Sequence, residues 1–322
     1  MGSGFDISSA VYGSQIYTRF SKSVIRELLE EVEAANITNA NNQKQGSGDG
    51  PCLSLTESSS QKLLSTVNDT QNQWDFTATP FTLPPGLELL MADVCGGSES
   101  PSMATKILNW KKNHRQTGFM DDYYWKDLKR CNRKICSLLQ NELASQSIRD
   151  GLRRDRARII ANRTAEQWKK PMPSSWHEFE GSSWDVATKL YDLRMTFLEC
   201  RQNLKGMGRA AGKAARGTNV DTATGGEVPV EPDEQTALAN ATMKLPGVVA
   251  AGVPVAGGYD SLCVIYVKGP ETEGGMSDLV RDEICNLWKE LSSSDGKVLC
   301  PLSLRAAGSG GNNGLCASNL GW

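Results

Sequence analysis

The stretch EPDEQTALANATMKLPGVVAAGVPVAGGYDSLCVIYVKG, residues 231–269, decides the fold class of this chain. It opens with a predicted helix, and two apolar runs follow at 247–253 and 262–267. Apolar runs of this length, bounded by glycine and proline, are typical of buried strands. The small residues of the loop 256–258 would let the backbone lie against something bulky or charged. The stretch therefore predicts a helix and two strands joined by a glycine loop.

The sequence on either side extends this pattern. Downstream, apolar residues at helical spacing over 280–291 precede a predicted strand near 298–304. In the middle of the chain, apolar residues step by three and four over 124–138 and over 186–204, which predicts two helices that each bury one stripe. The order of elements from residue 234 onward suits a split βαβ arrangement. We predict an α+β fold built as a two-layer sandwich.

A second glycine-rich unit lies upstream of the helices. The turn LPPG at 83–86 leads into the apolar run 87–94, which we predict to be a buried strand. The segment CGGSESPSM, 95–103, then forms a loop with Pro101 at a helix start. Strand, loop and helix N-terminus in this order can form an anion site, because free backbone amides and the helix dipole point into the loop. An ordinary strand-to-helix turn is the alternative.

The first residues of the chain place a carboxylate behind glycine. In GSGFD, residues 2–6, Asp6 follows two glycines at the start of a predicted helix. Such glycines let the backbone approach a ligand closely, and a carboxylate there can accept a proton from a substrate oxygen. The alternative is that Gly4 forms a turn and Asp6 is merely the N-cap. A strand over 14–20 and a short helix over 25–32 are predicted next.

Composition excludes several classes of function. The chain has 322 residues and a net charge of -2, which gives no electrostatic case for binding nucleic acid or a membrane. No apolar stretch approaches the roughly 18 residues that a membrane span needs. Nine cysteines without a CxxC pair, beside two histidines, argue against a disulfide framework and against a zinc site. We expect a cytoplasmic protein with reduced thiols, and we assign no residue as a metal ligand.

Two segments are predicted to lack regular structure. Residues 36–79 are mostly polar, which predicts a flexible surface insertion with a single helical turn near Leu63. Residues 206–230 are rich in glycine and alanine, which predicts a long loop.

The three glycine-serine segments GSGFD, CGGSESPSM and AGVPVAGGYDS together resemble a known family. They are similar to the eukaryotic phosphomevalonate kinases of the GHMP small-molecule kinases, whose pattern reads roughly GSGFDVSAAVYGS, LPPGL, DVCGGSxTPSMV, IEPxxQTxLLDA and PGVxxAGVPGAGGFDA. The resemblance runs from Gly2 to about Val267. It implies a GHMP kinase-like sandwich in which 1–35 is the remnant of an incomplete N-terminal domain, 36–79 the insertion, and 80–322 the C-terminal domain with a helical insertion.

The resemblance implies an activity and a set of site residues. The γ-phosphate of ATP would pass, with Mg²⁺, to 5-phosphomevalonate and give 5-diphosphomevalonate for isoprenoid synthesis. Asp6 matches the family's carboxylate, and we assign it to positioning the acceptor, because a phosphate needs little help to lose a proton. The residues implied to pack against the nucleotide are Gly252, Ala256, Gly257 and Gly258, and those implied on the acceptor side are Gly4, Ser98, Ser102 and Lys106.

The chain also departs from the family pattern. Val255 stands where the family usually has glycine, and Ser100 replaces a threonine while keeping the hydroxyl. The ATP-binding pattern PxxxGLGSSAA, which should precede GSGFD, does not occur. We therefore expect Met1 to open a truncated chain without measurable kinase turnover. The alternative is a catalytically inactive fragment or paralogue that acts as a metabolite-binding module or pairs with a separately encoded N-terminal piece.

Overall fold

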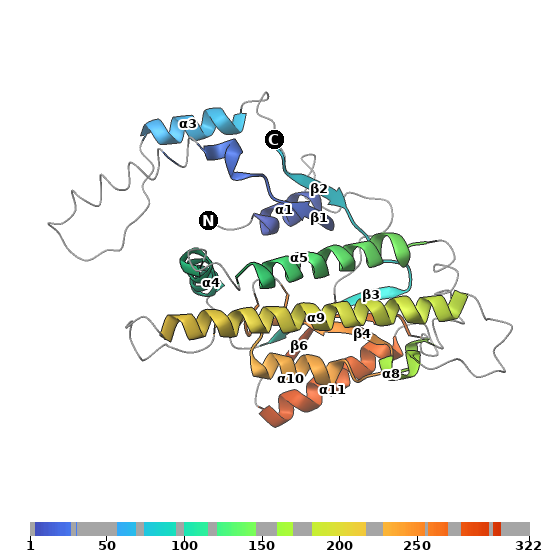
Figure 1. Cartoon of the computed structure of the whole chain (residues 1–322). Helices are drawn as coiled ribbons and strands as arrows, with labels where there is room; N and C mark the ends of the chain where they lie inside the picture. Colours follow the sequence, from blue (N-terminus) through green and yellow to red (C-terminus); the bar gives the residue numbers. More distant parts are fainter. Residues whose placement is uncertain are drawn as a thin grey trace. The chain divides into compact units, whose positions relative to one another are not determined.

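The computed structural model describes residues 4–26, 30, 57–68, 74–94, 100–114, 121–145, 160–169, 182–216, 228–254, 257–269, 278–295 and 299–303. The chain divides into two compact units, one comprising 1–82 with 307–322 and the other 83–306. Figure 1 shows the helices and strands of both. The sequence-based boundaries at residues 35 and 79 stay predictions.

The first unit holds a two-stranded antiparallel sheet. In it β1 (Gln15–Thr18) pairs with β2 (Thr77–Pro80), and α1 (Phe5–Tyr12) contacts both strands. β1 corresponds to the strand predicted over 14–20. A 3-10 turn, η1 (Lys22–Ile25), stands where the sequence predicts the start of a helix. The 12-residue helix α3 (Glu57–Asn68) corrects the expectation of a single turn, because leucine and valine at helical spacing lie hidden in a polar stretch.

The second unit is built on a four-stranded antiparallel sheet. Its strands lie in the order β4 (Val248–Gly252), β5 (Ser261–Val267), β3 (Leu87–Val94) and β6 (Leu299–Ser303). Leu90 of β3 lies opposite Val264 of β5. β3 therefore runs parallel to β4 with β5 between them, and β5 runs parallel to β6 with β3 between them. This is the split βαβ order that the sequence suggests, and the fold is α+β.

Six helices accompany this sheet in the described part of the second unit. They are α4 (Ser100–His114), α5 (Asp121–Ser137, continued by a π-helical turn at Leu138–Glu142), α8 (Ala165–Trp168), α9 (Ser182–Arg216), α10 (Asp233–Thr242) and α11 (Leu279–Asp295). α9 and α10 contact β4, and α11 contacts β6. In Figure 1, α9 runs across the unit with α5 on one side and α10 and α11 on the other. The helices thus bring their apolar stripes to the sheet and to one another.

Helix α9 corrects one prediction from the sequence. It continues to Arg216, into the segment 206–230 that composition predicts to be a loop. A Cβ atom at Gly206 would lie 2.8 Å from a ring carbon of Tyr124, and one at Gly208 would lie 2.3 Å from the carbonyl oxygen of Val228. Only glycine fits at these two positions because the helix packs closely against Tyr124 and Val228. The alanines that follow are strong helix formers, so the helix can continue.

Two apolar clusters hold the second unit together. All five residues of β4 are buried, and Val280, Ile284 and Trp288 present one buried stripe of α11. The indole nitrogen of Trp288 donates to the hydroxyl of Thr242 in α10 at 3.0 Å. The other cluster joins α4, α5, α9 and the segment at 228–230 through Met103, Ile107, Trp110, Leu128, Met207, Ala211, Val228 and Val230. The second cluster supports the segment that faces the glycine loop.

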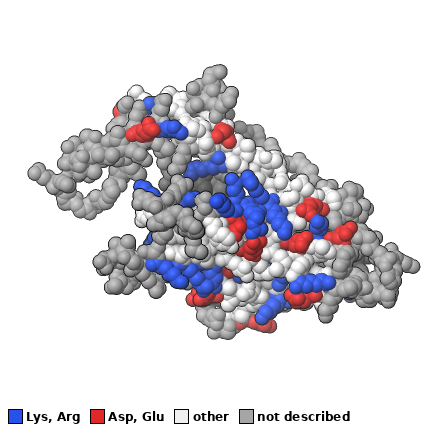
Figure 2. All heavy atoms as spheres, in the orientation of Figure 1, with Lys and Arg blue, Asp and Glu red and all other residues white. Residues whose placement is uncertain are grey.

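The described surface carries charges of both signs. Figure 2 shows basic and acidic side chains beside one another over much of one face. Arg130 of α5, for example, pairs with Asp127 on its own helix and with Glu199 on α9. Within the described residues, none of the helices combines the length and the apolar character needed to cross a bilayer.

Candidate functional site

Both glycine-rich segments of the second unit border the same end of the sheet. β3 ends at Val94, directly before CGGSE, and β4 ends at Gly252, directly before the loop 253–260. The backbone amide of Val94 donates to the carbonyl oxygen of Asp260 at 2.8 Å, where β5 begins. Antiparallel pairing places the end of β3 beside the start of β5. The start of CGGSE therefore lies beside the end of the loop 253–260.

The two glycines of the loop are fixed by the backbone of another segment. Gly257 and Gly258 have φ angles of 84° and 104°, in the region that favours glycine. The Gly257 amide donates to the Pro254 carbonyl at 3.1 Å, and the Gly258 amide donates to the Val230 carbonyl at 3.0 Å. A Cβ atom at Gly257 would lie 2.0 Å from that Val230 oxygen. Both amides are thus used within the chain, and contact with residue 230 requires glycine at 257.

Gly252 meets a side chain of α9 at the end of β4. A Cβ atom at Gly252 would lie 3.2 Å from Cδ of Arg201, so glycine leaves room for the arginine stem. The Gly252 carbonyl accepts a hydrogen bond from Sγ of Cys263 at 3.2 Å. Burial raises the pKa of Cys263 to about 11, so at neutral pH this thiol is protonated and donates the bond. The thiol is a structural contact of the strand end and not a nucleophile.

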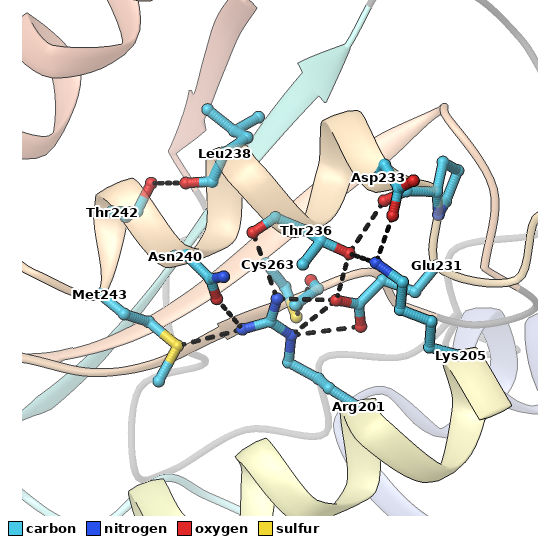
Figure 3. Close-up of polar contacts among 12 residues, drawn as sticks. Arg201, Lys205, Glu231, Asp233, Thr236, Leu238, Asn240, Thr242, Met243 and Cys263 are labelled. Atoms are coloured by element: carbon cyan, nitrogen blue, oxygen red, sulfur yellow. Dashed lines mark hydrogen bonds and ion pairs between the residues drawn. The ribbon is translucent and has the colours of Figure 1, made fainter.

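A buried ion pair lies behind the loop (Figure 3). The guanidinium of Arg201 donates to both carboxylate oxygens of Glu231, with Nη2 to Oε1 at 2.7 Å and Nε to Oε2 at 3.1 Å. Only 7% of the arginine side chain and 2% of the glutamate side chain are exposed. Nη1 also donates to Oδ1 of Asn240 at 3.1 Å and contacts Sδ of Met243. Nη2 also contacts the Thr236 carbonyl oxygen. The pair connects α9 to α10 and to the segment before it.

A second ion pair extends this network toward the surface. Nζ of Lys205, one turn after Arg201 on α9, donates to Oδ1 of Asp233 at 2.5 Å and to Oγ1 of Thr236 at 2.9 Å. The Thr236 hydroxyl donates in turn to Oε1 of Glu231 at 3.1 Å. Lys205 holds the pKa of the Asp233 carboxyl below its usual range. The start of α10 is therefore tied to α9 at two successive turns.

Two acceptor oxygens beside the loop have no donor in the described part of the chain. The amide nitrogen of Gln235 donates to the Tyr259 carbonyl at 2.8 Å, which fixes the orientation of the amide. Its oxygen Oε1 is buried without a hydrogen-bond partner, and so is Oδ1 of Asp260. Buried acceptors of this kind fit a ligand that brings a donor or a cation. Among the described residues, no three His, Cys, Asp or Glu side chains gather to hold a metal ion.

Helix α4 carries two of the predicted acceptor-side residues, Ser102 and Lys106. Ser102 is half-buried and Lys106 is exposed one turn later, so both lie on the same face of the helix. The helix starts at Ser100, close to the predicted start at Pro101, and follows the segment after Val94. Ser98 and Ala256 lie outside the described residues.

Asp6 and Gly4 lie in the other unit. Gly4 is the N-cap of α1 with a φ of 77°, and Asp6 is an exposed residue of the first turn. Asp6 is therefore not the N-cap, which corrects the simpler interpretation of GSGFD. An acidic side chain in the first turn interacts favourably with the helix dipole. The carboxylate stays accessible to a ligand.

Similarity to known proteins gives this geometry a context. The chain is 29% identical over 276 residues to "Phosphomevalonate kinase, peroxisomal" of Arabidopsis thaliana, covering 85% of this chain and 45% of the relative. It is 26% identical over 269 residues to the phosphomevalonate kinase of Candida albicans, covering 83% and 46%. It is 26% identical over 326 residues to phosphomevalonate kinase erg8 of Aspergillus fumigatus, covering 100% and 51%. The chain is related to the eukaryotic phosphomevalonate kinases.

The relationship to phosphomevalonate kinases covers only part of those proteins. The chain spans about half the length of the curated relatives it matches. No family profile matches it. Among solved structures, the Lin0012 protein from Listeria innocua aligns with a TM-score of 0.47 and 14% identity, over 95% of this chain and 55% of that chain. That similarity is too low to support an argument about the fold.

Sequence reasoning on the phosphomevalonate kinase pattern missed the residues behind the loop. Arg201 follows Phe197 by four residues and precedes Leu204 by three, so it lies on the apolar stripe of α9. This spacing is the available signal that the arginine is buried. Glu231 immediately precedes Pro232 and α10, where an acidic residue is typical of a helix start. Nothing in the spacing of the two residues indicates that they meet.

Three titratable side chains lie at the opposite end of the same sheet. Glu88 of β3 lies opposite Tyr266 of β5. Asp278 accepts hydrogen bonds from the amides of Gly269 and Val280 at 2.9 and 3.0 Å, which caps α11. Burial raises the pKa values of Glu88, Asp278 and Tyr266. We interpret the described residues at this end as a structural cap.

The Glu88→Gln variant is expected to be more stable than the wild type at neutral pH. Because burial raises the folded-state pKa of Glu88 above its unfolded value of about 4.3, proton binding favours the folded state. Stability contributed by this group is present below the unfolded pKa and is lost as the pH rises through the folded pKa. Urea unfolding measured at several pH values checks this, with exposed Glu290→Gln as the control. A variant that loses stability with pH as steeply as the wild type would contradict the assignment.

Proposed function

We propose that this chain takes part in the phosphomevalonate kinase reaction, in a fold of the GHMP kinase type. An oxygen of the phosphate of 5-phosphomevalonate would bond to the γ-phosphorus of ATP, and the bond from that phosphorus to the β–γ bridging oxygen would break, which releases ADP and gives 5-diphosphomevalonate. The observation that carries the proposal is the hydrogen bond from Val94, the residue before CGGSE, to Asp260 at the end of the glycine loop, in a chain related to phosphomevalonate kinases.

The residues at this end would act mainly by shape and by hydrogen bonds. Because the amides of Gly257 and Gly258 already bond to carbonyl groups of the chain, the loop would offer a rigid wall without side chains to the nucleotide phosphates and to the substrate. The N-terminus of α4 follows the other loop, and helix N-termini favour phosphate. The hydroxyls of Ser98 and Ser102 would donate to the acceptor phosphate, and Lys106 would add positive charge.

Asp6 would position the acceptor or its metal ion. A phosphate acceptor is already largely ionised at neutral pH, so the reaction depends on placement and on neutralising charge more than on a general base. Mg²⁺ would supply this neutralisation, and it usually takes one or two protein carboxylates together with substrate phosphates. Asp260, whose Oδ1 is buried without a hydrogen-bond partner among the described residues, fits that requirement, and Asp6 offers an accessible carboxylate.

Ligand binding tests the proposal directly. By isothermal titration calorimetry, the chain is expected to bind 5-phosphomevalonate at least about tenfold more tightly than mevalonate, because hydrogen bonds to a charged phosphate contribute about 1.5–3 kcal/mol. Ser102→Ala is expected to remove much of this preference. Asn109→Ala, an exposed change on the same helix, is the matched control. Equal affinity for both compounds, or no binding of either, would contradict the proposed substrate.

A metabolite-binding module is the second candidate function. It is supported by the buried acceptor oxygens of Gln235 and Asp260, which have no hydrogen-bond partner among the described residues and fit a bound ligand. We expect the purified chain to bind 5-phosphomevalonate without releasing ADP from MgATP, as followed by ³¹P NMR. Formation of 5-diphosphomevalonate at a normal enzymatic rate would overturn this expectation and establish the complete activity in this chain.

We propose the cytoplasm as the site of action. The Arabidopsis thaliana relative is described as peroxisomal, so the compartment is a separate question from the chemistry. Imaging of the full-length native protein beside a peroxisomal marker separates the two locations.

A further inference from the structure

Arg201 and two residues near Glu231 contact the glycine loop. At the beginning, Cδ of Arg201 lies 3.2 Å from where a Cβ atom of Gly252 would be. In the middle, Val230, the neighbour of Glu231, accepts the hydrogen bond of the Gly258 amide at 3.0 Å. At the end, Gln235 on the helix that follows Glu231 donates to the Tyr259 carbonyl at 2.8 Å. The ion pair and the residues next to it therefore contact the described part of the loop at three places.

The side chains around the pair leave it little freedom to shift. The carboxylate of Glu231 receives hydrogen bonds from Nε and Nη2 of Arg201 and from the Thr236 hydroxyl. The remaining guanidinium nitrogen is held by Asn240 and Met243 of α10. A planar guanidinium with donors in a fixed fork orients its partner as well as attracting it, which a lysine does not do. The direction of the Val230 carbonyl follows from that of the adjacent Glu231.

A buried ion pair is a poor device for stability alone. Removing two charges from water costs about as much as their attraction returns, and apolar residues of similar volume often stabilise equally well. Stability alone therefore does not explain why Arg201 and Glu231 form a buried ion pair. We propose that Arg201 is a positioning residue, which through Glu231 fixes the backbone at Gly252 and at 257–260 in the conformation that receives the ligand phosphates. The ligand part of this inference rests on the proposed function.

The double variant Arg201→Met, Glu231→Leu separates a role of the ion pair in positioning the loop from a role in stability. It removes both charges together, so no unpaired charge is left buried, and it is expected to unfold near the urea midpoint of the wild type. Amide hydrogen exchange within 252–260 is nevertheless expected to become at least about tenfold faster, while exchange in α11 stays unchanged. The affinity for 5-phosphomevalonate is expected to fall by about tenfold as the loop loses its preorganisation.

A matched control lies earlier on the same helix. Lys189 of α9 pairs with Glu142, and both side chains are about one third exposed. The double variant Lys189→Met, Glu142→Leu removes an equivalent pair that does not touch the loop. It is expected to leave both loop exchange and ligand affinity unchanged. A loss of loop protection in this control equal to that in the Arg201 variant would overturn the proposal.

Each remaining outcome decides the proposal. If the Arg201→Met, Glu231→Leu chain folds and its loop amides exchange as slowly as in the wild type, Arg201 is not a positioning residue. If that chain does not fold, Arg201→Lys takes its place, because it keeps the charge and loses the fork. Faster exchange confined to 252–260 then supports the proposal, and unchanged exchange overturns it. A wild-type chain that binds no 5-phosphomevalonate refutes the proposed function, while the exchange measurement still decides the role of Arg201.

Discussion

Gly257→Ala is expected to lower the free energy of unfolding of the second unit by about 2–5 kcal/mol. Its φ of 84° costs about 1–2 kcal/mol for a residue with a side chain. The added methyl group would also start 2.0 Å from the Val230 oxygen, and forcing such an overpacked contact typically costs about 1–3 kcal/mol more. Because that oxygen also accepts the Gly258 amide, the loop would move away from residue 230. Urea unfolding and hydrogen exchange measure the two effects.

Gly4→Ala is the matched control for backbone strain without a clash. Gly4 has a φ of 77°, similar to that of Gly257, but a Cβ atom there would lie 3.6 Å from the Tyr17 hydroxyl, an ordinary contact. We expect this variant to cost its own unit only about 1–2 kcal/mol, as resolved by hydrogen exchange. Equal costs at the two positions would mean that residue 230 does not press on the loop.

Trp288→Ala is expected to destabilise the second unit by about 3–5 kcal/mol. Removing a fully buried aromatic side chain leaves a cavity that the neighbouring helix and sheet fill only in part. The change also deletes the bond from the indole nitrogen to Thr242, which joins α11 to α10. Since α10 carries Gln235, a loosened contact between the helices should increase exchange in the loop as well. Thermal and urea unfolding of the purified variant measure the main effect.

Two further variants divide this effect into its parts. Trp288→Phe keeps most of the apolar volume and loses the hydrogen bond, so about 1 kcal/mol of the loss is expected from the bond itself, with a smaller cavity term added. Leu108→Ala removes a side chain that is 58% exposed on α4, and a change within about 0.5 kcal/mol is expected. A Trp288→Ala protein as stable as the Leu108→Ala protein would show that α11 does not pack against α10 and the sheet as described.

The regular elements of the second unit could be predicted because their side-chain patterns are local. The strands over 87–94, 247–253 and 262–267 and the helix over 280–291 follow from apolar runs and spacing, and they appear as β3, β4, β5 and α11. The end of α9 could not be predicted in this way. Gly206 and Gly208 look like loop residues until Tyr124 and Val228 are found packed against them.

The candidate site could be located from the sequence but not explained by it. Glycine segments after two strands indicate a loop that approaches something closely, and the pairing of β3 with β5 brings the end of β3 beside the end of that loop. For Gly257 the close partner is the Val230 carbonyl, and for Gly252 it is the stem of Arg201. Both partners are contacts between distant parts of the chain, which spacing alone does not encode. The sequence therefore identified the loop and missed the ion pair that holds it.

The most direct test of a phosphate site at this end of the sheet is a map of where 5-phosphomevalonate binds. Amide NMR of the ¹⁵N-labelled wild-type chain, titrated with this compound, reports on each backbone amide. We predict chemical-shift changes for the amides of 257–260 and of α4 around Ser102 and Lys106. The chemical shifts of the amides near Glu88, Tyr266 and Asp278 are expected to change little. Shifts concentrated at the Glu88 end, or none at saturating ligand, would contradict this prediction.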